Sequence, residues 1–108
     1  MSQPATITGW IGARPDEVPA RLLARVTEVA AAHPAWSDLP LPEAFREAGE
    51  CLLKGVLNAG PDVARASALD LLAADACVTW AFEAAAEDPA SLGARADAAM
   101  RRIREVAE

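Results

Sequence analysis

The stretch that decides the fold is PDVARASALDLLAADACVTWAFEAAAED, residues 61–88. It predicts one long helix, with Pro61 or Asp62 in its first turn. An ordinary surface helix has one apolar stripe and one charged face, whereas large apolar side chains here occupy most of the circumference. They are Leu69, Leu71, Leu72, Cys77, Val78, Trp80 and Phe82. Such a helix needs neighbours on several sides, which this chain and another copy of it can provide.

Three more helices are expected around this one, which makes the chain all-α. Apolar residues at helical spacing predict a helix over about residues 18–33, another over about 43–57, and a C-terminal one that opens near residues 88–91. The C-terminal helix should present one apolar face inward, and that face consists of Leu92, Ala96, Ala99, Met100 and Ile103.

Two segments rich in proline or glycine lie outside these helices. Residues 1–16 lack a helical period and are expected to form an extended N-terminal segment, tied down by Trp10 and Ile11. Residues 34–42 are expected to form a Pro-rich loop that caps one end of the bundle through Trp36, Leu39 and Leu41. The sequence therefore predicts a compact bundle of about four helices in a single domain, residues 1–108.

Small residues should hold the second and third predicted helices together as an antiparallel hairpin. A row of small side chains lets two helix backbones approach closely, so Gly55 is expected to lie in the contact. The two rows are Ala44, Ala48, Cys51 and Gly55 on one helix, and Ala66, Ala73, Cys77, Ala81 and Ala84 on the other. In such a hairpin Cys51 and Cys77 lie about 12 Å apart along the axis, too far for a disulfide.

The composition excludes several classes of function. The chain has 16 acidic and 10 basic residues, a formal net charge of -6, which argues against binding nucleic acid. No apolar run resembles a signal peptide and the two cysteines form no stapled framework, so we expect a cytoplasmic protein with no membrane partner. His33 is the only histidine, and there is no zinc spacing, P-loop or dinucleotide fingerprint. No metal and no cofactor are therefore expected.

Carboxylates on the long helix are the candidates for chemistry. Asp75, Thr79 and Glu83 recur every four residues and line one strip, where two carboxylates can in principle act as acid and base. No nucleophile accompanies them, so we interpret the strip as the face that touches solvent. Asp70 lies within the row of small residues, where it is either exposed at the edge of the bundle or buried beside a cation.

One local resemblance falls on the same helix. Residues 68–87, ALDLLAADACVTWAFEAAAE, resemble the helix of all-α polyprenyl diphosphate synthases that reads L-A-x-D-A-x-x-x-x-A-F-E. The DDxxD motifs that hold magnesium and diphosphate in that family are missing, and the chain is too short for the family's helical cavity. No residue of this chain is therefore assigned a catalytic role from the resemblance.

Three functional hypotheses follow. The first is a non-enzymatic interaction or oligomerisation module that forms a homodimer or binds another protein, with interface residues Leu69, Asp70, Trp80, Phe82 and Trp36. The alternative is a bundle that binds a small apolar ligand through Asp75, Thr79, Trp80 and Phe82, with Leu72 and Met100 beside them. The third is an enzyme that uses Asp70, Asp75 or Glu83. The absence of a reactive set of side chains favours the first hypothesis.

Overall fold

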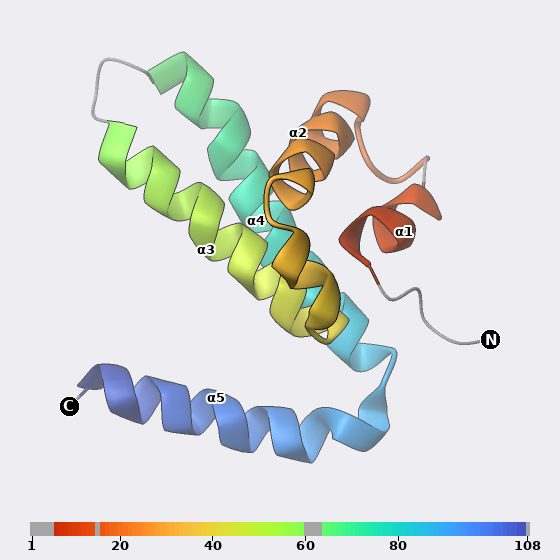
Figure 1. The fold of residues 1–108 in the computed structure, drawn as a ribbon, viewed down its shortest axis with the longest axis vertical. Coiled ribbons are helices and arrows are strands. Elements are labelled where there is room, and N and C mark those ends of the chain that lie inside the picture. The colour runs from red at the N-terminus through yellow and green to blue at the C-terminus, as the bar shows by residue number, and fades with distance from the viewer. Residues whose placement is uncertain (1–5, 15, 60–63, 108) are drawn as a thin grey trace.

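The computed structural model describes residues 6–14, 16–59 and 64–107. Across these residues the chain is all-α and contains no strand, which confirms the predicted fold class (Figure 1). The elements are α1 (Ile7–Gly12), α2 (Ala20–Ala31), the 3-10 helix η1 (Pro34–Asp38), α3 (Leu41–Ala59), α4 (Ala64–Ala86), the 3-10 helix η3 (Pro89–Ser91) and α5 (Leu92–Ala107). The predicted start of the long helix at residues 61–62 lies outside the described part.

The centre of the fold is an antiparallel hairpin of α3 and α4, which lie side by side along most of their length (Figure 1). Phe45 packs near Trp80, and Gly49 packs near Cys77, so the two helices run in opposite directions. Small residues form this contact: Ala44, Ala48, Gly49, Ala73, Ala74, Cys77 and Ala84 are all buried. The predicted hairpin is thereby confirmed.

The glycine at the closest approach is Gly49. A Cβ atom added there would lie 3.3 Å from Cγ2 of Val78 and 3.4 Å from the carbonyl oxygen of Ala74. Gly55, in contrast, is exposed and has nothing within 4 Å of an added Cβ. The prediction that Gly55 lies in the contact was therefore wrong, because the helix turns that residue away from α4 toward solvent.

The sequence predicted an extended N-terminal segment. This prediction was wrong for residues 7–12, which form the short helix α1. Its start is capped by Thr6, whose hydroxyl accepts a hydrogen bond of 3.1 Å from the amide of Gly9. Trp10 and Ile11 are fully buried, which confirms that these two residues tie the segment down. Burial of these side chains stabilises a helix that is too short and too rich in glycine to form alone.

The indole of Trp10 joins α1 to both helices of the hairpin. Its ring centroid lies 5.3 Å from that of Phe45 and 6.4 Å from that of Trp80. Its Nε1–H group donates to Oε2 of Glu87 at 3.2 Å, and Arg14 bonds the other carboxylate oxygen at 2.7 Å. The guanidinium of Arg14 also lies 3.5 Å from the centre of the indole ring. These contacts attach α1 to the C-terminal end of α4.

The proline-rich segment caps the bundle as predicted, although it is more helical than expected. Residues 34–38 form η1, and Trp36 and Leu39 pack partly buried against the core. Helix α3 then begins at Leu41, two residues before the predicted start, and buries both Leu41 and Pro42. A proline is tolerated there because the amide groups in the first turn of a helix have no carbonyl partner within the helix. Proline, which has no N–H group, therefore loses no helical hydrogen bond at this position.

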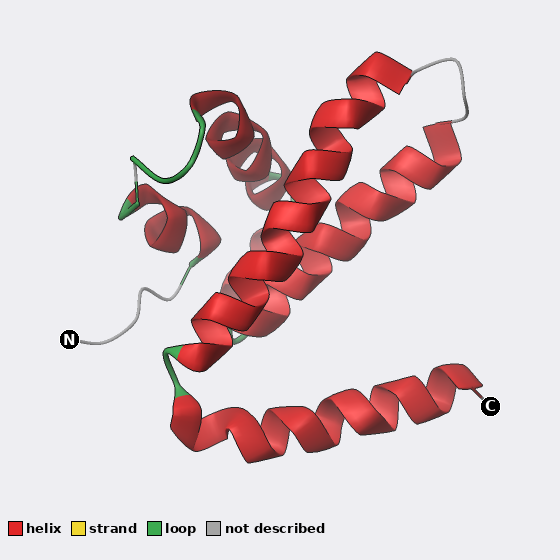
Figure 2. Ribbon diagram, turned by 180° about the vertical axis from the view of Figure 1, so that it is seen from behind, coloured by secondary structure: helices red, strands yellow, loops and turns green. Residues whose placement is uncertain are grey.

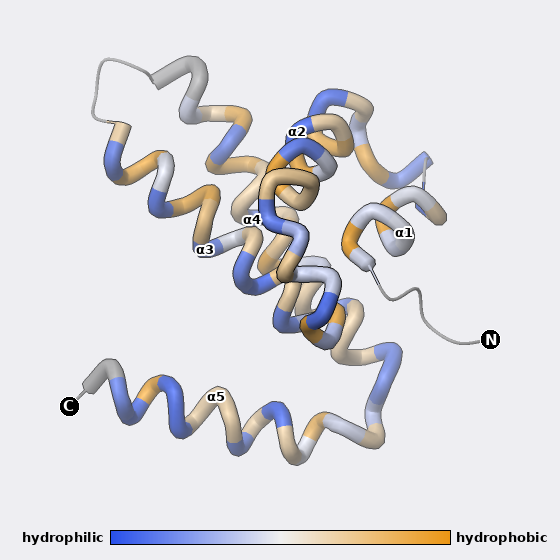
Figure 3. The backbone as a smooth tube through the Cα atoms, in the orientation of Figure 1, coloured by the Kyte–Doolittle hydropathy of each residue, from blue (hydrophilic) through white to orange (hydrophobic). Residues whose placement is uncertain are grey.

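Helix α5 leaves the end of α4 and diverges from the hairpin (Figure 2). Hydrophobic and hydrophilic stretches alternate along it (Figure 3), as its sequence predicts. Its apolar face does not point inward, however, because Leu92, Met100 and Ile103 are 47%, 56% and 68% exposed. Ala96 and Ala99 are exposed too, so this prediction was wrong for all five residues. An apolar stripe indicates that a helix face needs cover, but it does not indicate which element covers it.

Candidate interaction surface

The residues predicted to form a site are divided between two sides of α4. Asp75, Thr79 and Phe82 lie on the outer side and are exposed, Phe82 to 74%. Trp80 lies on the inner side, partly buried, with its ring centroid 5.9 Å from that of Phe45. The structure therefore does not bring the four predicted ligand-binding residues together, and Leu72 and Met100 are exposed as well.

The outer strip of carboxylates faces solvent. Asp75 and Glu83 are exposed, and neither side chain makes an ion pair with another described residue. The hydroxyl of Thr79 donates to the carbonyl oxygen of Asp75 at 3.1 Å, so its own helix uses it. This arrangement agrees with the interpretation of the strip as a wetted face.

Asp70 has a cation partner within the chain. Its two carboxylate oxygens accept hydrogen bonds of 2.6 Å and 3.1 Å from Nε and Nη2 of Arg25, which also bonds Glu28 at 2.9 Å. This hydrogen bond with Asp70 raises the pKa of Arg25, against the effect of partial burial. The side chain of Asp70 is 24% exposed, between the two alternatives that the sequence left open. Arg25 therefore ties α2 to α4.

Trp36 and Leu69 complete the set of predicted interface residues, and both are partly buried. The ring of Trp36 stacks on the imidazole of His33, with centroids 4.1 Å apart and planes 6° apart. Nδ1 of His33 lies 2.9 Å from the carbonyl oxygen of Val29, which assigns the proton to Nδ1. Nε2 then faces Sγ of Cys51 at 3.9 Å. These contacts fix the end of α2 against α3.

The two cysteines are both free thiols, and they differ in environment. The predicted axial offset of about 12 Å between them was wrong, because Cys77 packs against Gly49, only two residues from Cys51, which is an offset of about 3 Å. Cys77 is fully buried in the α3–α4 contact, and this burial raises the pKa of its thiol to about 12. Cys51 is only partly buried. Among the described residues no group of three or more His, Cys, Asp or Glu side chains is placed to hold a metal ion.

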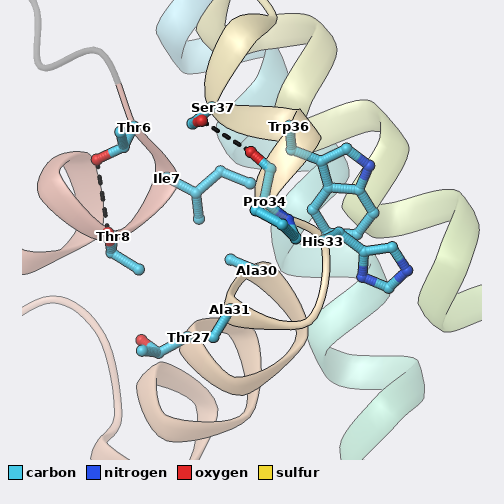
Figure 4. Close-up of a pocket in the computed structure, with 10 residues that line it drawn as sticks. All are labelled: Thr6, Ile7, Thr8, Thr27, Ala30, Ala31, His33, Pro34, Trp36 and Ser37. Atoms are coloured by element: carbon cyan, nitrogen blue, oxygen red, sulfur yellow. Dashed lines mark hydrogen bonds between the residues drawn. The ribbon is translucent and has the colours of Figure 1, made fainter.

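A cavity of about 340 Å³ lies between α1, the C-terminal part of α2 and η1 (Figure 4). Its walls combine apolar side chains with hydroxyl groups, and the hydroxyl of Ser37 is already bonded to the carbonyl oxygen of Pro34 at 2.7 Å. The rings of His33 and Trp36 stack on the other side of Pro34 from Thr6 and Thr8 (Figure 4). None of the residues proposed for ligand binding from the sequence lines this cavity.

Apolar side chains outside the core form a surface that no other described residue covers. On α4 we define the outer stripe as Leu71, Val78 and Phe82, which are 52%, 46% and 74% exposed. Their spacing of i, i+7 and i+11 places them along one line of the helix. Of this stripe, only Phe82 was predicted from the sequence as a site residue, although the i, i+7, i+11 spacing is visible in the sequence. Further large apolar side chains are exposed beyond it: Leu53, Leu57, Leu72, Leu92, Met100 and Ile103.

Polar contacts attach α5 to α3. Nη1 of Arg95 lies 2.6 Å from Oε2 of Glu43, and Nη2 of Arg102 lies 3.2 Å from Oε1 of Glu50. Partial burial acts to raise the pKa of Glu50, but its hydrogen bonds and attraction to Arg46 and Arg102 outweigh that effect and lower it. Helix α5 is therefore placed by ion pairs, and its apolar face is left outside the contact.

Comparisons of this chain with known protein families, with curated proteins and with solved structures find no match. Within the described residues, none of the helices has both the length and the apolar character needed to cross a membrane.

Proposed function

We propose that this chain is a non-enzymatic interaction module that forms a homodimer, with the outer stripe of α4 in the interface. The single observation that carries the proposal is the exposure of Leu71, Val78 and Phe82 along one line of a helix. Full burial of a side chain of this size contributes about 1.5–3 kcal/mol, so leaving three of them in water is costly. Closed two-fold dimers are the commonest way for proteins to cover such a surface.

Phe82 is the proposed anchor of this interface. The sequence suggested either Trp80 or Phe82, and Trp80 already packs against the rings of Trp10 and Phe45. Phe82 is the most exposed of the large apolar side chains of α4. Aromatic side chains are enriched among residues that dominate the energy of an interface.

The two free thiols support our further proposal of a cytoplasmic location.

Sedimentation over a range of protein concentrations tests the proposal. The parent chain should form dimers, and Phe82→Glu should shift it to monomers without loss of the helical far-UV signal. Ala24→Glu is the matched control, because Ala24 is an exposed residue of α2 on another part of the molecule. A parent that remains monomeric at high micromolar concentration would refute the homodimer.

A second candidate function is binding of a small apolar ligand in the cavity between α1, α2 and η1. Its volume of about 340 Å³ falls within the range of known ligand pockets. This candidate keeps the class of ligand expected from the sequence but moves the site away from α4. Titration with an apolar fluorescent dye tests it: Ala30→Phe should fill the cavity and abolish binding, whereas Phe82→Glu should leave binding unchanged.

A further inference from the structure

We infer that Cys51 and His33 form a reactive thiol–imidazole pair, and that hydrogen peroxide oxidises Cys51 there to a sulfenic acid. This modification site goes beyond the proposed homodimer and does not depend on it, because neither residue belongs to the outer stripe of α4. Three properties of the pair support it: the thiol contacts a base, the imidazole ring is fixed in place, and the surroundings of the thiol favour reaction.

The imidazole of His33 is oriented to accept the proton of the thiol. Its Nδ1–H group donates to the carbonyl oxygen of Val29 at 2.9 Å, so the free lone pair of the ring is on Nε2. Nε2 lies 3.9 Å from Sγ of Cys51, a weak hydrogen bond in which the thiol is the donor. A neighbouring base activates a cysteine because the thiolate, and not the thiol, is the nucleophile.

Two contacts hold the ring of His33 in this orientation. One is the hydrogen bond from Nδ1 to Val29, which fixes the edge of the ring that lies opposite Cys51. The other is the indole of Trp36, which stacks on the face of the ring with centroids 4.1 Å apart (Figure 4). Because an edge and a face are both fixed, Nε2 stays beside Sγ and is available for more than one proton transfer there.

The surroundings of the two cysteines favour reaction at Cys51. Cys77 is fully buried, and burial raises the pKa of its thiol to about 12, whereas Cys51 is only partly buried. Positive charge also lies near Cys51. The pKa of Arg25 is raised mainly by its hydrogen bond with Asp70, and attraction to Cys51 adds to this effect. Reactive cysteines are typically found in partly exposed positions close to cationic groups.

The oxidation needs hydrogen peroxide as its only co-reactant. Nε2 of His33 takes the thiol proton, and the thiolate sulfur of Cys51 attacks one peroxide oxygen, so that an S–O bond forms and the O–O bond breaks. The leaving hydroxide takes the proton back from Nε2 and departs as water. Sulfur loses two electrons, and the peroxide is reduced to water and to the hydroxyl group of the sulfenic acid. One imidazole thus serves both proton transfers.

Labelling with a β-diketone, which reacts with sulfenic acids, tests the site in the full chain. After peroxide treatment, mass spectrometry should find the label on Cys51 of the parent, formed at least about tenfold faster than on free cysteine. Cys77 is the internal control and should stay unlabelled, and Cys51→Ala should take no label. A parent that takes no label on Cys51, or that reacts no faster than free cysteine, overturns the inference.

His33→Phe tests the imidazole, because phenylalanine keeps a ring beside Trp36 but has no nitrogen to carry a proton. Its reaction with peroxide should be slower by about tenfold or more. Exchange with an aromatic disulfide is the matched comparison, since the thiolate that leaves needs no proton, and it should slow less. If both reactions slow equally, or if neither slows, His33 returns no proton to the leaving group and the inference is overturned. Far-UV circular dichroism verifies that the variant remains folded.

Discussion

The α3–α4 hairpin and helix α5 are both alanine-rich and helical, yet they are held by different forces. In the hairpin, Ala48, Gly49 and Cys77 exclude water, and the backbones approach closely. Helix α5 instead rests on ion pairs from Arg95 and Arg102, while its apolar side chains remain in solvent. The difference shows that similar composition specifies a helix but not its attachment: close packing holds the two helices of the hairpin together, whereas the apolar side chains of α5 remain exposed.

The largest effect should come from the core beside the hairpin. Phe45 is fully buried, so Phe45→Ala should lower the free energy of unfolding by about 3–5 kcal/mol. The matched control is Phe82→Ala, since the chain has only 2 phenylalanines and Phe82 is exposed. Urea denaturation at low protein concentration, where self-association contributes least, measures both. Equal losses for the two variants would contradict the contrast between the buried hairpin and the exposed faces.

A smaller effect is expected at the closest approach of the two helices. Gly49→Leu should cost about 1–3 kcal/mol, because its side chain would overlap Val78 and the backbone of Ala74. Gly55→Leu should instead stabilise the protein by up to about 1 kcal/mol, because leucine favours the helix more than glycine does and the site is open. Thermal or urea unfolding compares the pair. A Gly49 variant as stable as the Gly55 variant would mean that the contact is loose.

Alkaline pH should weaken the hairpin through Cys77. Burial raises the pKa of this thiol from 9.0 to about 12, so above pH 9 the unfolded chain releases a proton that the folded chain retains. Stability should therefore fall as the pH rises from 9 toward 12, with a slope of at most about 1.4 kcal/mol per pH unit. Urea denaturation at a series of pH values measures the slope. Cys77→Ala should remove this part of it, and an unchanged slope in that variant would assign the effect elsewhere.

The smallest effect is expected where α5 meets α3. Arg102→Gln should cost less than about 1 kcal/mol, because the pair with Glu50 is largely exposed and screened. Because the pKa of Glu50 is lowered in the folded chain, its ion pairs contribute to the free energy of unfolding above pH 4.5. This contribution is lost as the pH falls below that value. Hydrogen exchange should become faster in α5 and stay unchanged in the hairpin. Faster exchange in both regions would show that α5 supports the hairpin after all.

The sequence predicted the long helices well because their apolar spacing is local information. It failed at α1, since Gly9 and Gly12 disfavour a helix and only the burial of Trp10 and Ile11 stabilises one. It also placed Gly55 rather than Gly49 in the hairpin contact. Both residues are small, and only the rotation of α3 about its own axis distinguishes them.

The candidate surface was predicted in part. The excess of apolar side chains around α4 was evident from the sequence, and so was Phe82 as one of them. The sequence did not show that Trp80 would pack inward against Trp10, because that contact joins residues far apart in the chain. The pairing of Asp70 with Arg25 was hidden for the same reason, since only the folded arrangement brings α2 beside α4.

The attachment of Trp10 bears on how the protein is made. A ribosome produces Trp10 and its partner Phe45 long before it produces Trp80 and Glu87, and the indole completes its contacts only after those last two residues have emerged. The indole thus lacks its partners on α4 until late in synthesis, and closing so long a loop is slow compared with forming the helices. In the nascent chain, α3 is therefore expected to form first and α1 to pack against the hairpin last. In the interval, Trp10 is a site that chaperones can bind.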